Sequence, residues 1–111
     1  MNRSVAIWAT PSQAVRVAIS EATAEAKKAD IVIVFANQWS SEGFDQPDLN
    51  LPEGQDALID AVAAANPNTV VVLQTGGPVL MPWLGKTAAV LQAWYPGIKG
   101  GEAIASVLFG N

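Results

Sequence analysis

Two segments of the chain are continuous apolar runs, rich in β-branched residues and of strand length. They are residues 31–36 (IVIVFA) and 69–73 (TVVVL). Such runs are typical of strands in a parallel sheet whose two faces are both covered. Residues 88–94 (AAVLQAW) predict a third strand, and residues 4–9 (SVAIWA) predict a weaker fourth strand at an edge.

Helical patterns alternate with these strands. Thr10 followed by Pro11 predicts a helix start with proline at the first position. The apolar stripe of this first helix is Val15, Ala18, Ile19, Ala22, Ala26 and Ala29. A second helix is predicted over residues 53–65, with an end at Asn66-Pro67. Its apolar face is Leu58, Ala61, Val62 and Ala65. A third helix follows Gly100-Gly101, and a short helix is expected between positions 76 and 86. The third helix has the apolar residues Ala103, Ile104, Val107 and Leu108.

This alternation predicts right-handed crossovers and an α/β fold. We expect a three-layer αβα sandwich, with a mainly parallel sheet of about four strands, formed by residues 1–111 as a single domain. Ligands of such sheets bind beyond the carboxyl ends of the strands. Three segments follow strands and should share that rim: residues 37–56, 74–78 (QTGGP) and 95–101 (YPGIKGG). The glycine pair in QTGGP predicts a tight turn that something approaches closely.

Charge and composition exclude several classes of function. The net charge is −4, and no Lys or Arg lies between Lys28 and Lys86, so nucleic acid is not expected as a partner. The chain has no Cys and no His, so thiolate nucleophiles, imidazole bases and the usual zinc sites are absent. No apolar run reaches membrane-spanning length, so no membrane partner is expected, and the compartment is left open.

Nucleotide-binding motifs are incomplete. LGKT at residues 84–87 resembles the end of a phosphate-binding loop, but Leu80 stands where that loop requires glycine. No G-x-G-x-x-G follows a strand, so the dinucleotide fingerprint is missing. A receiver-type phosphorylation site would need acidic residues directly after the first strand, and SVAIWAT has none.

Glu42 is the carboxylate of the acidic loop that lacks a structural explanation. Asp45, Asp48, Glu53 and Asp56 fit as turn residues or as first-turn helix residues. Glu42 lies in SSEGF, between two aromatic residues at positions 39 and 44. Aromatic neighbours shield a carboxyl from water and favour its protonated form, which a general acid requires. From the residues alone, a solvated surface glutamate remains the simpler interpretation.

Five segments then occur in a characteristic order: EGFD, LPEGQDALI, ANPNTVVVL, GGPVLMPW and AWYPGIKGGEAIASVLFG. This set resembles the C-terminal α/β domain of family 3 glycoside hydrolases, the β-glucosidase family, over residues 26–111. In that family, two carboxylates on two domains carry out retaining hydrolysis. The nucleophilic aspartate belongs to an N-terminal (β/α)8 barrel, and the position of Glu42 resembles that of the acid/base.

The resemblance therefore implies a fragment that carries the acid/base loop of an enzyme acting on β-glucosides or oligosaccharides. Trp39, Phe44 and Asp45 are candidate substrate-binding residues, and no cofactor or metal is implied. We expect the isolated chain to be inactive, because the barrel and its nucleophile are not in it. We also expect a homo-oligomer, formed through a sheet edge or an exposed helix face, since a small sheet leaves apolar surface to cover.

Several positions depart from the family pattern. Gln46 replaces the usual arginine, and Ile98 and Lys99 replace two polar or acidic residues. The chain also ends at Asn111, where the family continues, and it begins inside the α/β domain. These departures motivate an alternative, a catalytically silent binding or self-assembly module on the same fold.

Overall fold

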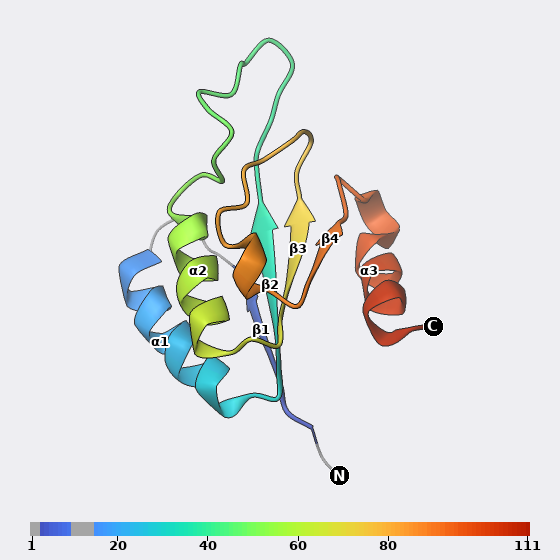
Figure 1. The fold of residues 1–111 in the computed structure, drawn as a ribbon. Helices are drawn as coiled ribbons and strands as arrows, with labels where there is room; N and C mark the ends of the chain where they lie inside the picture. The colour runs from blue at the N-terminus through green and yellow to red at the C-terminus, as the bar shows by residue number, and fades with distance from the viewer. Residues whose placement is uncertain (1–2, 10–14) are drawn as a thin grey trace.

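The computed structural model describes residues 3–9 and 15–111. Within them, strands and helices alternate along the chain (Figure 1). The elements are β1 (Val5–Ala9), α1 (Val15–Lys28), β2 (Ile31–Asn37), α2 (Gln55–Ala65), β3 (Thr69–Gln74), the 3-10 helix η1 (Leu84–Lys86), β4 (Ala89–Gln92), the 3-10 helix η2 (Gly97–Lys99) and α3 (Gly100–Phe109). The strands form one sheet in the order β1-β2-β3-β4, and each neighbouring pair is parallel. The predicted α/β class is confirmed.

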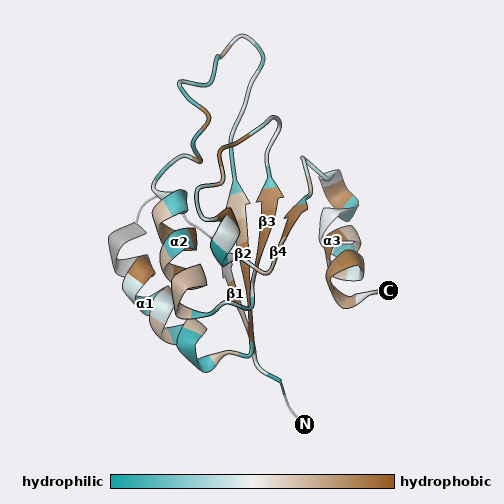
Figure 2. Cartoon of the chain, viewed as in Figure 1, coloured by the Kyte–Doolittle hydropathy of each residue, from teal (hydrophilic) through white to brown (hydrophobic). Residues whose placement is uncertain are grey.

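The sheet lies between two helical layers, with α1 and α2 over one face and α3 over the other (Figure 1). Alternate residues of β2 point to opposite faces, as the pleat requires. Val32 and Val34 join the core beneath α1 and α2, whereas Ile33 packs with Ile104 of α3. The central strands are therefore mostly apolar and end in polar residues at the rim (Figure 2), and the predicted three-layer sandwich is confirmed.

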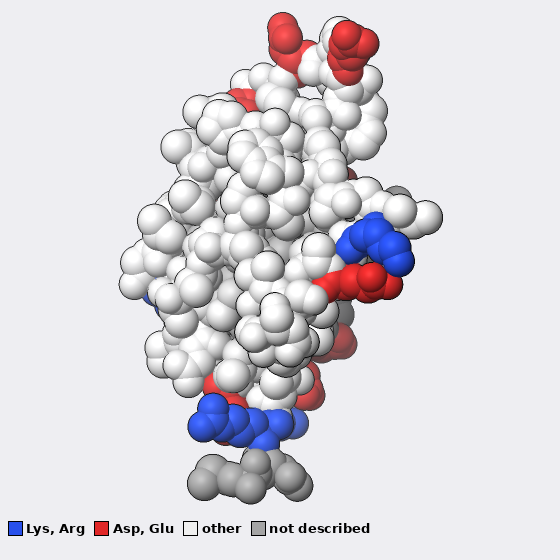
Figure 3. All heavy atoms as spheres, turned by 90° about the vertical axis from the view of Figure 1, so that its right-hand side faces the viewer, with Lys and Arg blue, Asp and Glu red and all other residues white. Residues whose placement is uncertain are grey.

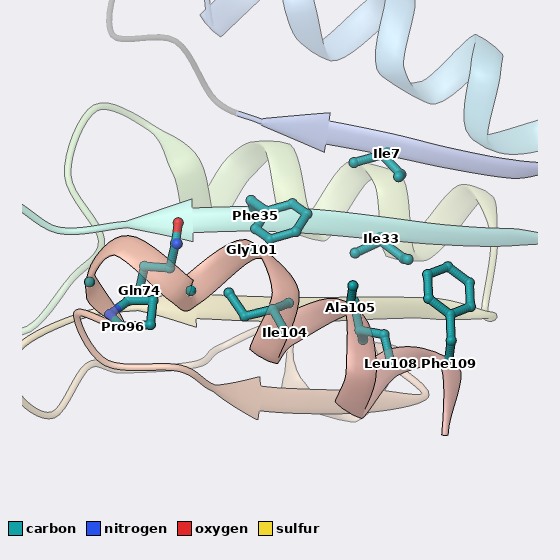
Figure 4. A pocket seen from close by; sticks show the side chains of 12 residues that line it. Ile7, Ile33, Phe35, Gln74, Pro96, Gly101, Ile104, Ala105, Leu108 and Phe109 are labelled. Carbon is teal, nitrogen blue, oxygen red and sulfur yellow. The ribbon is translucent and has the colours of Figure 1, made fainter. Parts of the chain in front are cut away.

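The face beneath α3 is covered only in part. A groove of about 310 Å³ runs between α3 and the sheet, and Figure 4 shows side chains from both lining it. Ile7 of the edge strand β1 is 60% exposed beside this groove, and Phe109 at its far end is 65% exposed. Seen from the α3 side, the molecule presents a broad surface with few charged groups (Figure 3).

Two elements begin or end at other residues than predicted, next to residues with left-handed backbone. The second helix was expected from residue 53, but α2 begins at Gln55 because Glu53 (φ 60°) and Gly54 (φ 74°) have left-handed backbone. The third strand was expected over residues 88–94, but β4 ends at Gln92, and Trp94 has φ 56°. Glu53 is therefore not a first-turn helix residue.

The helix faces also differ in part from prediction. Ala22 and Ala26 of the α1 stripe are buried, whereas Thr10, Pro11 and the side chains of Val15 and Ala18 lie outside the described residues. In α2, Leu58 and Val62 are buried as expected, and Ile59 joins them. In α3, Ile104 is buried and Leu108 is half-buried, but Val107 and Ala103 are exposed because only one edge of the helix meets the sheet. In the described part of the chain, no helix has the length and apolarity that a membrane crossing needs.

Candidate functional site

The segments that follow β2, β3 and β4 meet at one rim of the sheet, as predicted. The loop of residues 38–54 rises from the end of β2 and forms the tip of the molecule (Figure 1). The Leu80 N–H, in the segment after β3, donates to the Leu49 carbonyl over 2.8 Å. The Ser40 hydroxyl lies 2.9 Å from the phenol oxygen of Tyr95, in the segment after β4. Parallel strands place their carboxyl ends together, so this rim follows directly from the topology.

Glu42 sits on a tight turn near the start of this loop. Ser41 and Phe44 form an isolated bridge, and the Phe44 N–H donates to the Ser41 carbonyl over 3.3 Å. Gly43 has φ 76°, which a glycine adopts without steric cost. The turn leaves Glu42 exposed, and none of the described residues forms an ion pair with it.

The two aromatic candidates lie beside this turn and contact each other. The ring centroids of Trp39 and Phe44 are 5.8 Å apart, in an edge-to-face arrangement with 71° between the planes. Trp39 is 68% exposed and Phe44 is 66% exposed, so neither ring belongs to the core of this chain. Asp45, the third candidate, is exposed on the same turn. The structure thus brings two rings together next to Glu42 and leaves their outer faces open.

Two other carboxylates of this stretch, Asp48 and Asp56, have structural partners. The Asp48 carboxylate accepts a hydrogen bond from the Asn50 N–H over 2.8 Å, which is the turn role that the sequence predicts. Asp56, in the first turn of α2, accepts a hydrogen bond from the Trp83 indole over 2.7 Å. Within residues 3–9 and 15–111, no cluster of His, Cys, Asp or Glu has the arrangement of a metal site.

Three polar residues of the rim were not singled out from the sequence. The Tyr95 hydroxyl donates to the Gln38 carbonyl, and the same phenol oxygen contacts Ser40. Together with Asn37 and Trp39, these residues line an open cavity of about 400 Å³ beside the loop. Gln38 and Ser40 belong to the acidic stretch, and Tyr95 follows a predicted strand. Their shared place on the rim was therefore predictable, but their contact was not.

The sequence profile of the glycosyl hydrolase family 3 C-terminal domain matches residues 2–111. The chain belongs to this family. A β-glucosidase from Rhizobium radiobacter is 57% identical over 96 residues, which cover 84% of this chain and 12% of that protein. β-Glucosidase B from Emericella nidulans is 55% identical over 97 residues, which cover 83% of this chain and 12% of that protein.

Solved structures of the family have the same fold. The first is DesR, a β-glucosidase from Streptomyces venezuelae in complex with D-glucose. It matches with a TM-score of 0.84 and 57% identity, over 86% of this chain and 12% of that one. The β-glucosidase from Kluyveromyces marxianus in complex with glucose matches with a TM-score of 0.84 and 39% identity, over 91% of this chain and 12% of that one. The chain thus spans a small part of these relatives.

Against this family background, the three sequence departures have distinct local environments. Gln46 does not leave a gap in the loop, because its side-chain amide donates to the Trp39 carbonyl over 2.9 Å. Ile98 is fully exposed in η2, at the rim. Lys99 pairs with Glu102 over 3.5 Å, and both side chains are largely in solvent. Gln46 therefore connects the two ends of the turn that carries Glu42 and Phe44.

Proposed function

We propose that this family 3 domain carries the acid/base half of a retaining β-glucosidase-type active site, with Glu42 as the acid/base. The observation that carries the proposal is the placement of Glu42. Its side chain is exposed on a tight turn at the ligand-binding rim of a parallel sheet, beside two exposed aromatic rings. A core glutamate, or one held in an ion pair, would not have been available for proton transfer.

The chemistry requires a second carboxylate. In retaining hydrolysis, one carboxylic acid protonates the glycosidic oxygen while the second carboxylate attacks the anomeric carbon, about 5–5.5 Å away. The first residue then acts as a base and removes a proton from the water that cleaves the glycosyl-enzyme intermediate. In this proposal, Glu42 takes the first role, and another domain, a (β/α)8 barrel, supplies the nucleophile. Trp39, Phe44 and Asp45 would contact the sugar.

The isolated chain should accordingly be inactive. A general acid contributes roughly 10²–10⁴-fold by itself, far less than the hydrolysis of a stable glycoside requires. Purified chain should therefore show no turnover of aryl β-glucosides. Turnover that Glu42→Gln abolishes would contradict the two-domain proposal.

The decisive experiment restores the other half of the site. The matching 96 residues of the Rhizobium radiobacter β-glucosidase are replaced by those of this chain, since the two are 57% identical there. Two aryl β-glucosides are compared, one with an activated dinitrophenyl leaving group and one with a poor methylphenyl leaving group. Glu42→Gln should lower kcat/KM by about 10²–10⁴-fold for the poor leaving group. The loss should be much smaller for the activated one, which needs no protonation.

Glu53→Gln is the matched control, because it removes the same charge from the same loop. It should leave both substrates within about twofold of the unmodified chimera, since Glu53 has no role in the chemistry. Equal losses for the two leaving groups in Glu42→Gln, or no loss, would refute the acid/base role.

A silent binding module is the second candidate, and the fully exposed Ile98 at the rim favours it. An apolar side chain there replaces a polar position of the family and suits protein contact better than sugar contact. The same chimera separates the two functions. A chimera that folds and binds glucose but hydrolyses neither substrate would support the silent module.

A further inference from the structure

We infer that Tyr95 is a positioning residue for the acid/base: its phenol anchors the first residues of the loop that carries Glu42. The inference rests on the proposed function of Glu42. Tyr95 belongs to the segment after β4, whereas the loop follows β2, two strands away in the sheet. The contact therefore attaches the loop to the segment after β4, in addition to its covalent attachment to β2.

The hydrogen bonds at the phenol have a defined direction. Tyr95 has a single hydroxyl proton, and the Gln38 carbonyl accepts it. The phenol oxygen can then only accept from Ser40, so the Ser40 hydroxyl, 2.9 Å away, is the donor. The Tyr95 hydroxyl thus holds the Gln38 carbonyl and the Ser40 side chain, which lie four and two residues before Glu42.

Packing at Gly76 holds the ring in place. A Cβ atom at Gly76 would lie 2.8 Å from Cε2 of Tyr95, closer than real Cβ atoms come to other atoms, and 3.0 Å from Oγ of Ser40. A larger residue here would therefore force the Tyr95 ring or the Ser40 side chain to move, which agrees with the predicted close approach at this turn. The three segments of the rim meet at this one contact, so the ring cannot shift toward Gly76 or Ser40 without moving the turn after β3 or the loop, although its other side is open to solvent.

Two further supports of the loop lie on either side of Glu42 along the chain. Before it, the Gln38 N–H donates to the Gln74 carbonyl over 3.2 Å and continues the pairing of β2 with β3. After it, Gln46 connects back to Trp39 over 2.9 Å. The Tyr95 contacts hold the residues between the end of β2 and the turn with Glu42. Replacing Tyr95 by phenylalanine removes these hydrogen bonds and keeps the ring.

The consequence for catalysis is a defined location of the acid. Proton transfer needs hydrogen-bond reach, and a misplacement of about 1 Å can cost about 10²-fold in rate. Loss of the phenol contacts should therefore impair the protonation of the leaving group more than it impairs the binding of sugar.

The test uses Tyr95→Phe, which keeps the ring and removes both hydrogen bonds. In the 111-residue chain, amide hydrogen exchange of residues 39–44 should rise by about fivefold to thirtyfold, which is the effect of one to two lost hydrogen bonds of average strength. Exchange in the paired strands should stay unchanged. In the chimera, kcat/KM for the methylphenyl glucoside should fall by about 10-fold to 100-fold. The dinitrophenyl glucoside and inhibition by glucose should change less than about threefold.

Gly76→Ala provides a second, independent perturbation, because the added methyl group pushes against the same ring. It should reproduce the selective loss for the poor leaving group. Gly77→Ala is its matched control, since a Cβ atom there meets nothing within 4 Å, and it should change neither substrate.

The outcomes separate this inference from the proposed function. If Glu42→Gln shows no dependence on the leaving group, the proposed function fails. If Glu42→Gln shows that dependence but Tyr95→Phe lowers both substrates equally, or neither, then only the positioning role is wrong. Unchanged amide exchange in Tyr95→Phe would overturn the positioning role without reference to catalysis.

Discussion

Gln55 joins the start of α2 to the end of β2, and its replacement by leucine should destabilise the fold strongly. The side chain is 2% exposed. Its oxygen accepts from the Asn37 N–H over 2.9 Å, and its amide donates to the Asn37 carbonyl over 2.7 Å and to the Pro52 carbonyl over 3.0 Å. Both ends of the acidic loop are thus held by one amide group. Gln55→Leu keeps a similar volume and removes all of these bonds.

The magnitude follows from the number of bonds lost. A hydrogen bond contributes about 1 kcal/mol net to stability, so three of them should contribute about 3 kcal/mol. Asn37 is exposed, so water replaces part of the lost pairing at its backbone. We therefore expect the free energy of unfolding to fall by about 2–4 kcal/mol. The lower value applies if water replaces part of the lost hydrogen bonds, and the higher value applies if buried polar groups are left unpaired.

Urea unfolding of the chain, followed by tryptophan fluorescence, measures this loss. With a slope of about 1–3 kcal/mol per molar urea, the midpoint should fall by about 1–3 M while the slope stays constant. Gln46→Leu is the control, because it also removes a side-chain amide, but from one exposed hydrogen bond. It should cost less than about 1 kcal/mol. An equal loss in the two variants, or a loss below about 1 kcal/mol for Gln55→Leu, would refute the reasoning.

Three further predictions concern packing. Trp83 is fully buried and donates to the Asp56 carboxylate over 2.7 Å, so Trp83→Phe should lower the free energy of unfolding by about 2–3 kcal/mol. In the same urea assay, the double variant Trp83→Phe, Asp56→Asn should be little less stable than Trp83→Phe, because the hydrogen bond is already lost. Gly100→Ala would place a methyl group 2.6 Å from the preceding proline ring and should cost about 1–3 kcal/mol. At Gly101 an added Cβ atom has no neighbour within 4 Å, so Gly101→Ala should be neutral or stabilising in thermal melts. Equal melting temperatures for Gly100→Ala and Gly101→Ala would contradict this prediction. The chain should form a homodimer through the edge strand β1, where Ile7 is 60% exposed. In light scattering, Ile7→Lys should shift the chain toward the monomer. A monomeric unmodified chain at high micromolar concentration would contradict this prediction.

The strands and the rim were predictable because they depend on local patterns. Residues 31–36 and 69–73 are apolar without interruption, and only buried parallel strands suit such runs. Once the strands were assigned, the topology placed Glu42 at the ligand-binding edge. The exposure of Trp39 and Phe44 could not be read from the sequence, because an aromatic residue in a loop suits a core, an interface or a ligand equally well.

Two of the features that the sequence did not indicate depend on distant partners. Trp83 lies in a proline-bearing connection with no periodic pattern, yet its ring is fully buried in the core cluster that includes residues of α2, and its indole donates to Asp56. Trp94 ends its strand early through a left-handed backbone, which aromatic residues rarely adopt. The proposed role of Tyr95 depends on its contact with a residue of the loop that lies 55 positions earlier in the chain. No local rule of spacing or propensity contains such pairings.

If Glu42 has the proposed acid/base role, the exposure of the acidic turn predicts that one domain is insufficient for the chemistry. The rings of Trp39 and Phe44 contact each other, but each remains about two-thirds open to water. Electrostatic stabilisation and proton transfer gain strength when water is excluded from the site. The rim of this chain excludes little water by itself, although hydrogen bonds connect the three segments that form it. A partner surface that closes over the turn would therefore supply the nucleophile and the dry environment in one step, while this domain supplies a carboxyl group whose location is already set.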